Sequence, residues 1–299
     1  MLLNKPKLSI IIPTKTTNSY GYMRLLLCIQ HQDFPKDQLE VLPVTEGTSE
    51  SAKAIGIKRA KGEVIGIFAS DNVFEIKEFL SILYQAALSN GAAFPAFYSL
   101  KVGFKALDNY FALIGGNDVL SYYMGKNDRG SWLGPSRASE PIIGKALGDN
   151  GFFVKKELIE KTDLENYYHV DNANEIDAVP MPVPVGVMHA AGDGLFNYFK
   201  KRYRYGLQHA FNKNRRWHLV DFKNRSDIAR LIWFIFASVL LIPTLFLSIR
   251  GFLKKPDPAW FLHPIVCLAT LFTYGTLMVH VCARTMFRSL FALTAAQRA

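Results

Sequence analysis

Two apolar runs near the C-terminal end limit what this chain can fold into. They cover Leu231–Ile249 and Ala259–Ala283, and neither contains an Asp, Glu, Lys or Arg residue. At a rise of about 1.5 Å per residue, a helix of either length can cross the roughly 30 Å hydrocarbon core of a bilayer. Pro243 and Pro264 are tolerable there, because bilayer helices re-satisfy freed backbone groups locally. We therefore expect a hairpin of two transmembrane helices. A hairpin that dips into the bilayer without crossing it, and two buried helices of a soluble fold, are the alternatives.

Basic residues flank the two runs unevenly. The connecting sequence RGFLKKPDP carries three cations, whereas the outer flanks, residues 213–230 and 284–298, together carry nine. By the positive-inside rule, this asymmetry places the N-terminal body of the protein on the cytoplasmic side. The whole chain has a formal net charge of +10, but no recognised nucleic-acid-binding motif accompanies it. The charge therefore favours anionic lipid or a phosphorylated substrate as partner, and no nucleic acid.

The N-terminal region alternates between predicted strands and helices. Apolar runs predict strands at Leu8–Thr14, Leu39–Gly47 and 64–70, and helical spacing predicts helices at Tyr20–Gln32, Ser51–Lys61 and Ile76–Ser89. This alternation is typical of an α/β fold with an open, mostly parallel sheet. Ligands on such sheets bind beyond the carboxyl ends of the strands, which are here Pro13–Lys15, Thr45–Glu50 and Ala69–Asn72.

Four short motifs follow one another in this region. They are IIIPTK at the end of the first strand, TEGTSE after the second, AIGIKRAKGEVIGIF leading into the third, and ASDN after it. In this order and spacing they resemble the family 2 glycosyltransferases, from about Leu8 to Asn72 with weaker matches to about Trp217. The resemblance implies a Rossmann-like GT-A fold, a nucleotide-diphosphate sugar as donor, Mg²⁺ or Mn²⁺ as cofactor, and inversion at the anomeric carbon.

The resemblance also implies which residues contact the nucleotide. Pro13 and Thr14 end the first strand, and Glu46 and Glu50 stand where the family has acids that contact the base and ribose. A glutamate keeps the acceptor oxygens of an aspartate but reaches one methylene further. Without the resemblance, Glu46 and Glu50 are two solvated carboxylates in a turn.

A metal site is implied at the end of the third strand. Asp71 matches the last acid of the family's Asp-x-Asp motif, and Ala69 replaces the first acid. Hard cations prefer carboxylate oxygens, and Mg²⁺ is often held by one or two carboxylates with phosphates and water. Asn72 and, at the end of a late predicted strand, His189 are the residues expected to complete the site with Asp71. The alternative for Asp71 is a helix cap.

Further along the chain, the resemblance implies the catalytic and acceptor-side residues. Asp171 stands where the family has its general base, with Glu175 as the second candidate. Asp149 and Asn150 are expected to face the acceptor or the donor sugar. The alternatives are a helix cap for Asp171 and a simple Asp-Asn-Gly turn for the other pair.

A basic and aromatic segment, FKKRYRYGLQHAFNKNRRW, precedes the first apolar run. Arg202 and Arg204 are expected to clamp the diphosphate, because guanidinium groups suit phosphate geometry. Arg216 and Trp217 resemble the end of a Gln-x-x-Arg-Trp motif of processive family members and are assigned to the acceptor side. The alternative is an amphipathic helix lying on anionic lipid.

These expectations divide the chain into a GT-A domain (1–198), a basic juxtamembrane segment (199–230), two transmembrane helices (231–283) and an interfacial tail (284–299). The aromatic segment 94–137 is expected to be helical and to bind the acceptor. The predicted function is inverting transfer of a sugar to a lipid-linked acceptor, either a polyprenyl phosphate or a glycolipid, at the cytoplasmic membrane face. A catalytically silent membrane scaffold or partner subunit is the main alternative, and a nucleotidyltransferase is a weaker one.

Overall fold

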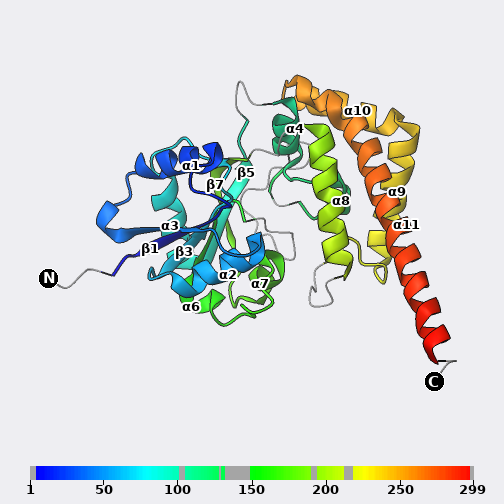
Figure 1. Ribbon diagram of the computed structural model, residues 1–299. Helices are drawn as coiled ribbons and strands as arrows, with labels where there is room; N and C mark the ends of the chain where they lie inside the picture. Colours follow the sequence, from blue (N-terminus) through cyan, green and yellow to red (C-terminus); the bar gives the residue numbers. More distant parts are fainter. Residues whose placement is uncertain are drawn as a thin grey trace.

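A computed structural model describes residues 5–100, 105–127, 129–131, 149–189, 194–211 and 218–296, with side chains described as far as Met286. A β-sheet with its covering helices forms one end of the molecule, and α9, α10 and α11 form the other (Figure 1). The helices α4 and α8 lie between these two parts (Figure 1).

The first half of the sheet follows the predicted alternation. The strands β1 (Leu8–Pro13), β2 (Leu39–Val44) and β3 (Val64–Ile67) are parallel, with Leu8 opposite both Leu39 and Val64. The connecting helices are α1 (Tyr20–Gln30), α2 (Ser49–Arg59) and α3 (Phe79–Asn90), and a short 3₁₀ turn, η1 (Lys36–Gln38), precedes β2. Ser19 caps α1, and Thr48 forms a capping box with Ser51 at the start of α2. The α/β class is therefore confirmed.

The second half of the sheet is more mixed than the sequence predicts. The strand order is β2-β1-β3-β6-β5-β7-β4, with β4 (Asn72–Val73), β5 (Ala92–Tyr98), β6 (Phe152–Lys155) and β7 (Met181–His189). Three of the six strand pairings are antiparallel, because β6 enters between β3 and β5 in the opposite direction and β4 runs against β7. The expectation of a mostly parallel sheet is wrong in this half, where only β5 and β7 pair in parallel.

Alternate residues of β1 enter two separate cores. Ile10 packs with side chains of α1 and α3 on one face, and Ile11 packs with side chains of α2 on the other. Both isoleucines are fully buried, as the continuous apolar run predicts for a strand covered on both faces.

The aromatic segment 94–137 is helical only in part: residues 94–98 belong to the strand β5, contrary to expectation, and helices follow it. These are α4 (Ala106–Ile114) and α5 (Val119–Met124), which pack with α8 (Leu195–Phe211), α9 and α11 around the fully buried Trp260. Two short helices, α6 (Lys156–Ile159) and α7 (His169–Glu175), lie between β6 and β7 along the chain. The third core thus joins the inserted segment to the C-terminal helices.

The C-terminal helices differ from a simple hairpin. The first apolar run is divided into α9 (Arg225–Leu240) and α10 (Ile242–Lys254), which are bent by 92° at Leu241, a residue with φ of 60°. Pro243 explains the break, because its ring clashes with the preceding turn and removes a backbone donor. A 3₁₀ turn, η2 (Pro258–Leu262), leads into α11 (His263–Ala296). By length and composition, the stretch Pro258–Met286 can cross a membrane, and the bent pair α9–α10 passes that test only as one broken span.

Candidate functional site

The short strand β4 brings Asp71 to His189. Asn72 pairs with His189 across the antiparallel β4–β7 ladder, so the residue before Asn72 lies at the end of β7. The Oδ1 atom of Asp71 is 3.1 Å from Nδ1 of His189. Gly21 of α1 permits this arrangement, because a Cβ atom there would lie 2.9 Å from the backbone oxygen of Ser70. Two of the predicted metal ligands therefore lie together at the carboxyl end of the sheet.

The Oδ1 atom of Asp71 is buried and has no hydrogen-bond partner in the described part of the chain. Its contact with His189 is close but lacks hydrogen-bond geometry, so the attraction is electrostatic. Burial raises the pKa of the Asp71 carboxyl, but the charges of His189 and Lys201 outweigh this effect and bring the pKa below its usual value. A carboxylate that stays ionised with an unsatisfied buried oxygen is suited to a cation.

Asn72 holds this corner together through its amide. Its Oδ1 accepts a hydrogen bond from the backbone N–H of Ala69, and its Nδ2 donates to Oδ1 of Asn150 at 2.9 Å. The same Nδ2 is 3.2 Å from Nδ1 of His189. His189 can therefore act as a ligand through Nδ1 only when that nitrogen releases Asn72. The oxygen of Asn72 is already in use, which argues against Asn72 as a metal ligand.

A second cluster forms around Lys53 of α2, whose side chain is 1% exposed. Its Nζ lies 2.6 Å from Oδ2 of Asp149 and 3.1 Å from Oε1 of Glu50. Burial lowers the pKa of Lys53, but the two carboxylates outweigh burial and raise it. Burial raises the pKa of Glu50, but Lys53 and His169 lower it to about 2. All three groups are therefore charged at neutral pH.

Glu50 also anchors the helix that carries Asp171. The backbone N–H of His169 donates to Oε2 of Glu50 at 3.3 Å, and the ring Nδ1 of His169 is 3.3 Å from Oε1. His169 is the first residue of α7, and Asp171 lies in the first turn of that helix. The first turn of α2 therefore fixes the start of α7, which carries Asp171 in its own first turn.

The two clusters meet in the Asp149-Asn150-Gly151 turn before β6. Asp149 binds Lys53, whereas Asn150 binds Asn72 and donates through Nδ2 to the hydroxyl of Tyr98 at 2.8 Å. Gly151 has φ of 82°, a conformation that favours glycine. The turn therefore joins the Asp71 corner to the Glu50 corner. The side chain of Asn150 is buried in these contacts, which argues against its expected acceptor-facing position.

Buried Arg129 holds this turn from the inserted segment. Its side chain is 2% exposed, and Nη2 donates to the backbone oxygen of Asn150 at 2.8 Å. The guanidinium carbon lies 5.0 Å from the ring centroid of Phe94 and 5.6 Å from that of Tyr98. The segment after α5 thus contributes directly to the site's support.

The remaining nucleotide-site candidates lie on the exposed rim. Glu46 forms a bidentate ion pair with Arg59 of α2. Pro13 ends β1, and Thr14 follows it with its backbone N–H bound to Val44 and its hydroxyl bound to the backbone oxygen of Thr16. These residues surround the carboxyl ends of β1 and β2, where the sequence predicts the nucleotide.

The basic residues of α8 point in different directions. Arg202 faces the helical core, where its guanidinium donates to Tyr198 Oη at 3.0 Å and to the backbone oxygen of Asn117. Arg204 is exposed. The charge of Lys201, also exposed, lowers the pKa of Asp71. Burial lowers the pKa of His189, but the neighbouring Asp71 outweighs burial and raises it. The cation of α8 that acts on the Asp71 corner is therefore Lys201, and the inward position of Arg202 argues against the predicted diphosphate clamp. Arg216 and Trp217 lie outside the described residues.

Sequence reasoning missed Lys53, His169, Lys201 and Arg129. A signal existed for Lys53, because it lies one helical turn before Ile57 on the apolar face of α2. The repeated Lys-Lys at 200–201 gave no way to tell which cation faces the sheet. His169 and Arg129 depend on contacts between distant segments, for which the sequence carried no comparable signal.

The donor set allows a divalent cation with few protein ligands. Among the residues that the structure describes, no group of three or more His, Cys, Asp or Glu side chains could hold a metal ion. Mg²⁺ commonly keeps several waters and uses one or two carboxylates with substrate phosphates. The unsatisfied Oδ1 of Asp71 fits that mode, with His189 as the neighbouring nitrogen donor.

The chain resembles solved structures only distantly. One is the mannosyltransferase PcManGT from Pyrobaculum calidifontis in complex with GDP-Man and Mn²⁺, with 16% identity, a TM-score of 0.44, and coverage of 90% of this chain and 86% of that one. Another is S. aureus TarS 1–349 in complex with UDP, with 13% identity, a TM-score of 0.40, and coverage of 91% and 90%. No family model and no curated protein matches the sequence.

Proposed function

We propose that this protein is an inverting glycosyltransferase of the family 2 type, a hexosyltransferase that uses a nucleotide-diphosphate sugar. The observation that carries the proposal is the Asp71–His189 pair at the carboxyl end of the sheet, with Oδ1 of Asp71 buried and unsatisfied. The motifs IIIPTK, TEGTSE and ASDN end the neighbouring strands at this edge. A diphosphate needs counter-charge, which a cation held at Asp71 and the ammonium group of Lys201 would supply.

Each side chain has a distinct role in the proposed transfer. Glu46 and Glu50 flank the nucleoside, and Lys201 faces the diphosphate. Asp71, with His189, would hold Mg²⁺ or Mn²⁺, which would supply neutralising charge to the leaving diphosphate. Asp171 accepts the proton of an acceptor hydroxyl as its oxygen attacks the anomeric carbon, while the bond to the diphosphate breaks on the opposite face. A single displacement of this kind inverts the anomeric centre.

A lipid-linked acceptor is supported by the position of α8. The charge of Lys201 on this helix lowers the pKa of Asp71, and Gly206 of the same helix lies against Leu277 of α11. The site and the apolar helices are therefore separated by a single helix, about 10 Å thick. A polyprenyl phosphate or a glycolipid can reach the sugar from the membrane. The basic residues that flank the apolar runs support contact with an anionic leaflet, such as that of a cytoplasmic membrane face.

A catalytically silent scaffold on the same fold is the rival function. Two observations favour it. Ala69 replaces the first acid of the metal motif, and Glu46 is already paired with Arg59. Only the enzyme would cleave a nucleotide sugar and release a nucleoside diphosphate. Purified protein is incubated with a panel of nucleotide sugars and Mn²⁺, and released nucleoside diphosphate is measured. Donor cleavage that is lost in Asp71→Asn supports the enzyme, and its absence across the panel supports the scaffold.

A further inference from the structure

The helices α9 and α10 expose large apolar side chains and bury small and polar ones. Their large apolar side chains point outward, among them Phe236 and Val239 of α9 and Ile242, Phe246 and Leu253 of α10, which are between 51% and 77% exposed. We call these five residues the apolar face. A soluble protein rarely exposes so large a continuous apolar surface.

The inward side of the same helices carries small and polar residues. Ser238, Thr244 and Ser248 are fully buried, and each hydroxyl donates to a backbone oxygen of its own helix. Gly251 lies against the ring of Trp260, where a Cβ atom would come within 2.6 Å. Small residues at helix contacts with large apolar residues outside are typical of helices in lipid.

The helix α11 lies along the protein body over the whole length of a possible membrane span. At its start, His263 contacts the hydroxyls of Tyr110 and Tyr123. Towards its end, His280 Nδ1 is 2.7 Å from the hydroxyl of Tyr203 of α8, and Arg284 lies over the ring of Phe211 at 4.6 Å. From His263 to Arg284 a helix extends about 31 Å, so one side of α11 is covered across a full bilayer thickness.

This covering conflicts with a transmembrane α11. The helix α8 runs beside α11 and lies between it and the sheet (Figure 1). If α11 crossed the bilayer, α8 would enter the hydrocarbon with exposed Lys200, Lys201 and Arg204. Charged side chains at that depth are costly and rare. The axis of α11 therefore lies along the membrane surface rather than across it.

We propose that α9, α10 and α11 form a monotopic membrane-binding surface that enters one leaflet, so that no helix described here crosses the bilayer. The two helices α9 and α10 are bent by 92° at Leu241, and each carries exposed residues of the apolar face. The partner is an anionic lipid surface, because exposed Arg225, Arg250 and Lys254 lie on the helices that carry this face. The proposal goes beyond glycosyl transfer and does not depend on it.

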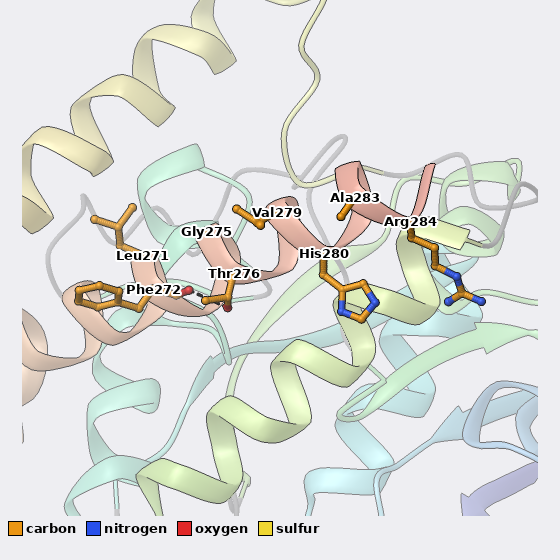
Figure 2. A pocket seen from close by; sticks show the side chains of 8 residues that line it. All are labelled: Leu271, Phe272, Gly275, Thr276, Val279, His280, Ala283 and Arg284. Carbon is orange, nitrogen blue, oxygen red and sulfur yellow. Dashed lines mark hydrogen bonds between the residues drawn. The ribbon is translucent and has the colours of Figure 1, made fainter. Parts of the chain in front are cut away.

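A groove of about 860 Å³ along α11 fits the same partner. Leu271 and Phe272 lie at one end, and His280 and Arg284 lie at the other (Figure 2). Between them the lining is small or apolar apart from Thr276. A hydrocarbon chain can follow the apolar part of this groove, with an anionic headgroup at Arg284.

Cysteine accessibility in membrane vesicles of known orientation tests the topology. Three full-length variants each carry one reporter in a chain with Cys28→Ser: the native Cys282, and Ser89→Cys or Pro256→Cys combined with Cys282→Ser. Native Cys267 is buried and stays in all of them. Vesicles of both orientations are used. A membrane-impermeant maleimide is expected to label positions 89 and 282 from the same face, and position 256 either from that face or, without detergent, in neither orientation. Labelling of 256 from the opposite face indicates a crossing hairpin, and labelling of 282 from the face opposite 89 indicates a crossing α11. Either result overturns the proposal.

A vesicle-binding assay tests the partner. The double variant Phe246→Asp, Leu253→Asp is compared with Met23→Asp, an exposed apolar residue on α1 outside the apolar face. Partition of the purified full chain into phosphatidylcholine–phosphatidylglycerol vesicles is expected to fall on the order of a hundredfold in the double variant and to stay unchanged in the control. Equal partition of all three proteins contradicts the proposal. A wild-type protein that remains a soluble oligomer without detergent also contradicts it, because the apolar face is then a protein interface.

Discussion

The ammonium group of Lys53 lies 2.6 Å from the carboxylate of Asp149, and this contact joins helix α2 to the turn before β6. Glu50 completes the cluster at 3.1 Å from the same Nζ. The lysine is almost fully buried, so its charge depends on these two partners. The cluster therefore fixes the start of α2, the Asp149 turn and the start of α7 relative to one another.

Replacement of Lys53 by Met is expected to lower the free energy of unfolding by about 3–5 kcal/mol, because two carboxylates lose their buried cation. Lys58→Met is the matched control, since Lys58 is exposed on the same helix and is expected to change stability by less than about 0.5 kcal/mol. Urea unfolding in detergent, followed by circular dichroism, gives both values. Equal stability of the two variants would show that the cluster does not hold the fold.

The cluster also predicts how stability depends on pH. The folded-state pKa of Glu50 is lowered from 4.5 to about 2, and the pKa of Asp149 is lowered as well. A lowered pKa contributes stability above the unfolded value, and this contribution is lost as the pH falls through the folded value. The free energy of unfolding is therefore expected to decrease between pH 4.5 and 2. Glu50→Gln is expected to reduce the slope of the free energy of unfolding against pH. Glu78→Gln, at an exposed site, is the control and is expected to keep the wild-type slope. Identical slopes in both variants would refute the role given to Glu50.

The sequence predicts the first ninety residues well because their signals are local. Leu8–Pro13 is apolar and β-branched throughout, and Ser19 and Thr48 cap the helices that follow. Asp71 and His189 were predicted only as ligands of one metal site. Their contact arises from the strand β4, whose two residues are too few to show a hydrophobic periodicity.

Other features depend on contacts that a sequence pattern does not encode. The antiparallel entry of β6 follows a long insertion. Arg202 and Lys201 have the same local sequence environment, yet one faces the helical core and the other acts on Asp71. The break at Leu241 follows from Pro243, but whether a bilayer helix kinks or ends at a proline is decided by its neighbours.

Lys201 is predicted to contribute to diphosphate binding. Lys201→Ala is expected to weaken binding of a nucleoside diphosphate by roughly tenfold to a hundredfold, the range of one charged hydrogen bond. Lys200→Ala is the control, because its exposed cation is not among the charges that act on Asp71. Calorimetric titration at two salt concentrations gives the affinities. A loss of equal size in both variants would indicate a general charge effect rather than a specific contact.

Asp171 is predicted to act in transfer and not in donor binding. Asp171→Asn is expected to reduce transfer to a hydroxyl acceptor by about 10²–10⁴-fold, with donor affinity unchanged. Glu175→Gln, one turn later on α7, is expected to retain activity. If Glu175→Gln loses transfer and Asp171→Asn keeps it, the roles of the two carboxylates are exchanged.

Metal-dependent nucleotide binding tests the central claim most directly. Calorimetric titration of GDP and UDP into the full-length protein is made with and without Mn²⁺, for the wild type, Asp71→Asn and the exposed control Asp37→Asn. We predict binding of at least one nucleotide that strengthens with Mn²⁺ in the wild type and in Asp37→Asn, and that loses this strengthening in Asp71→Asn. Binding that is absent in every case, or that responds to Mn²⁺ equally in Asp71→Asn, would contradict the proposed site.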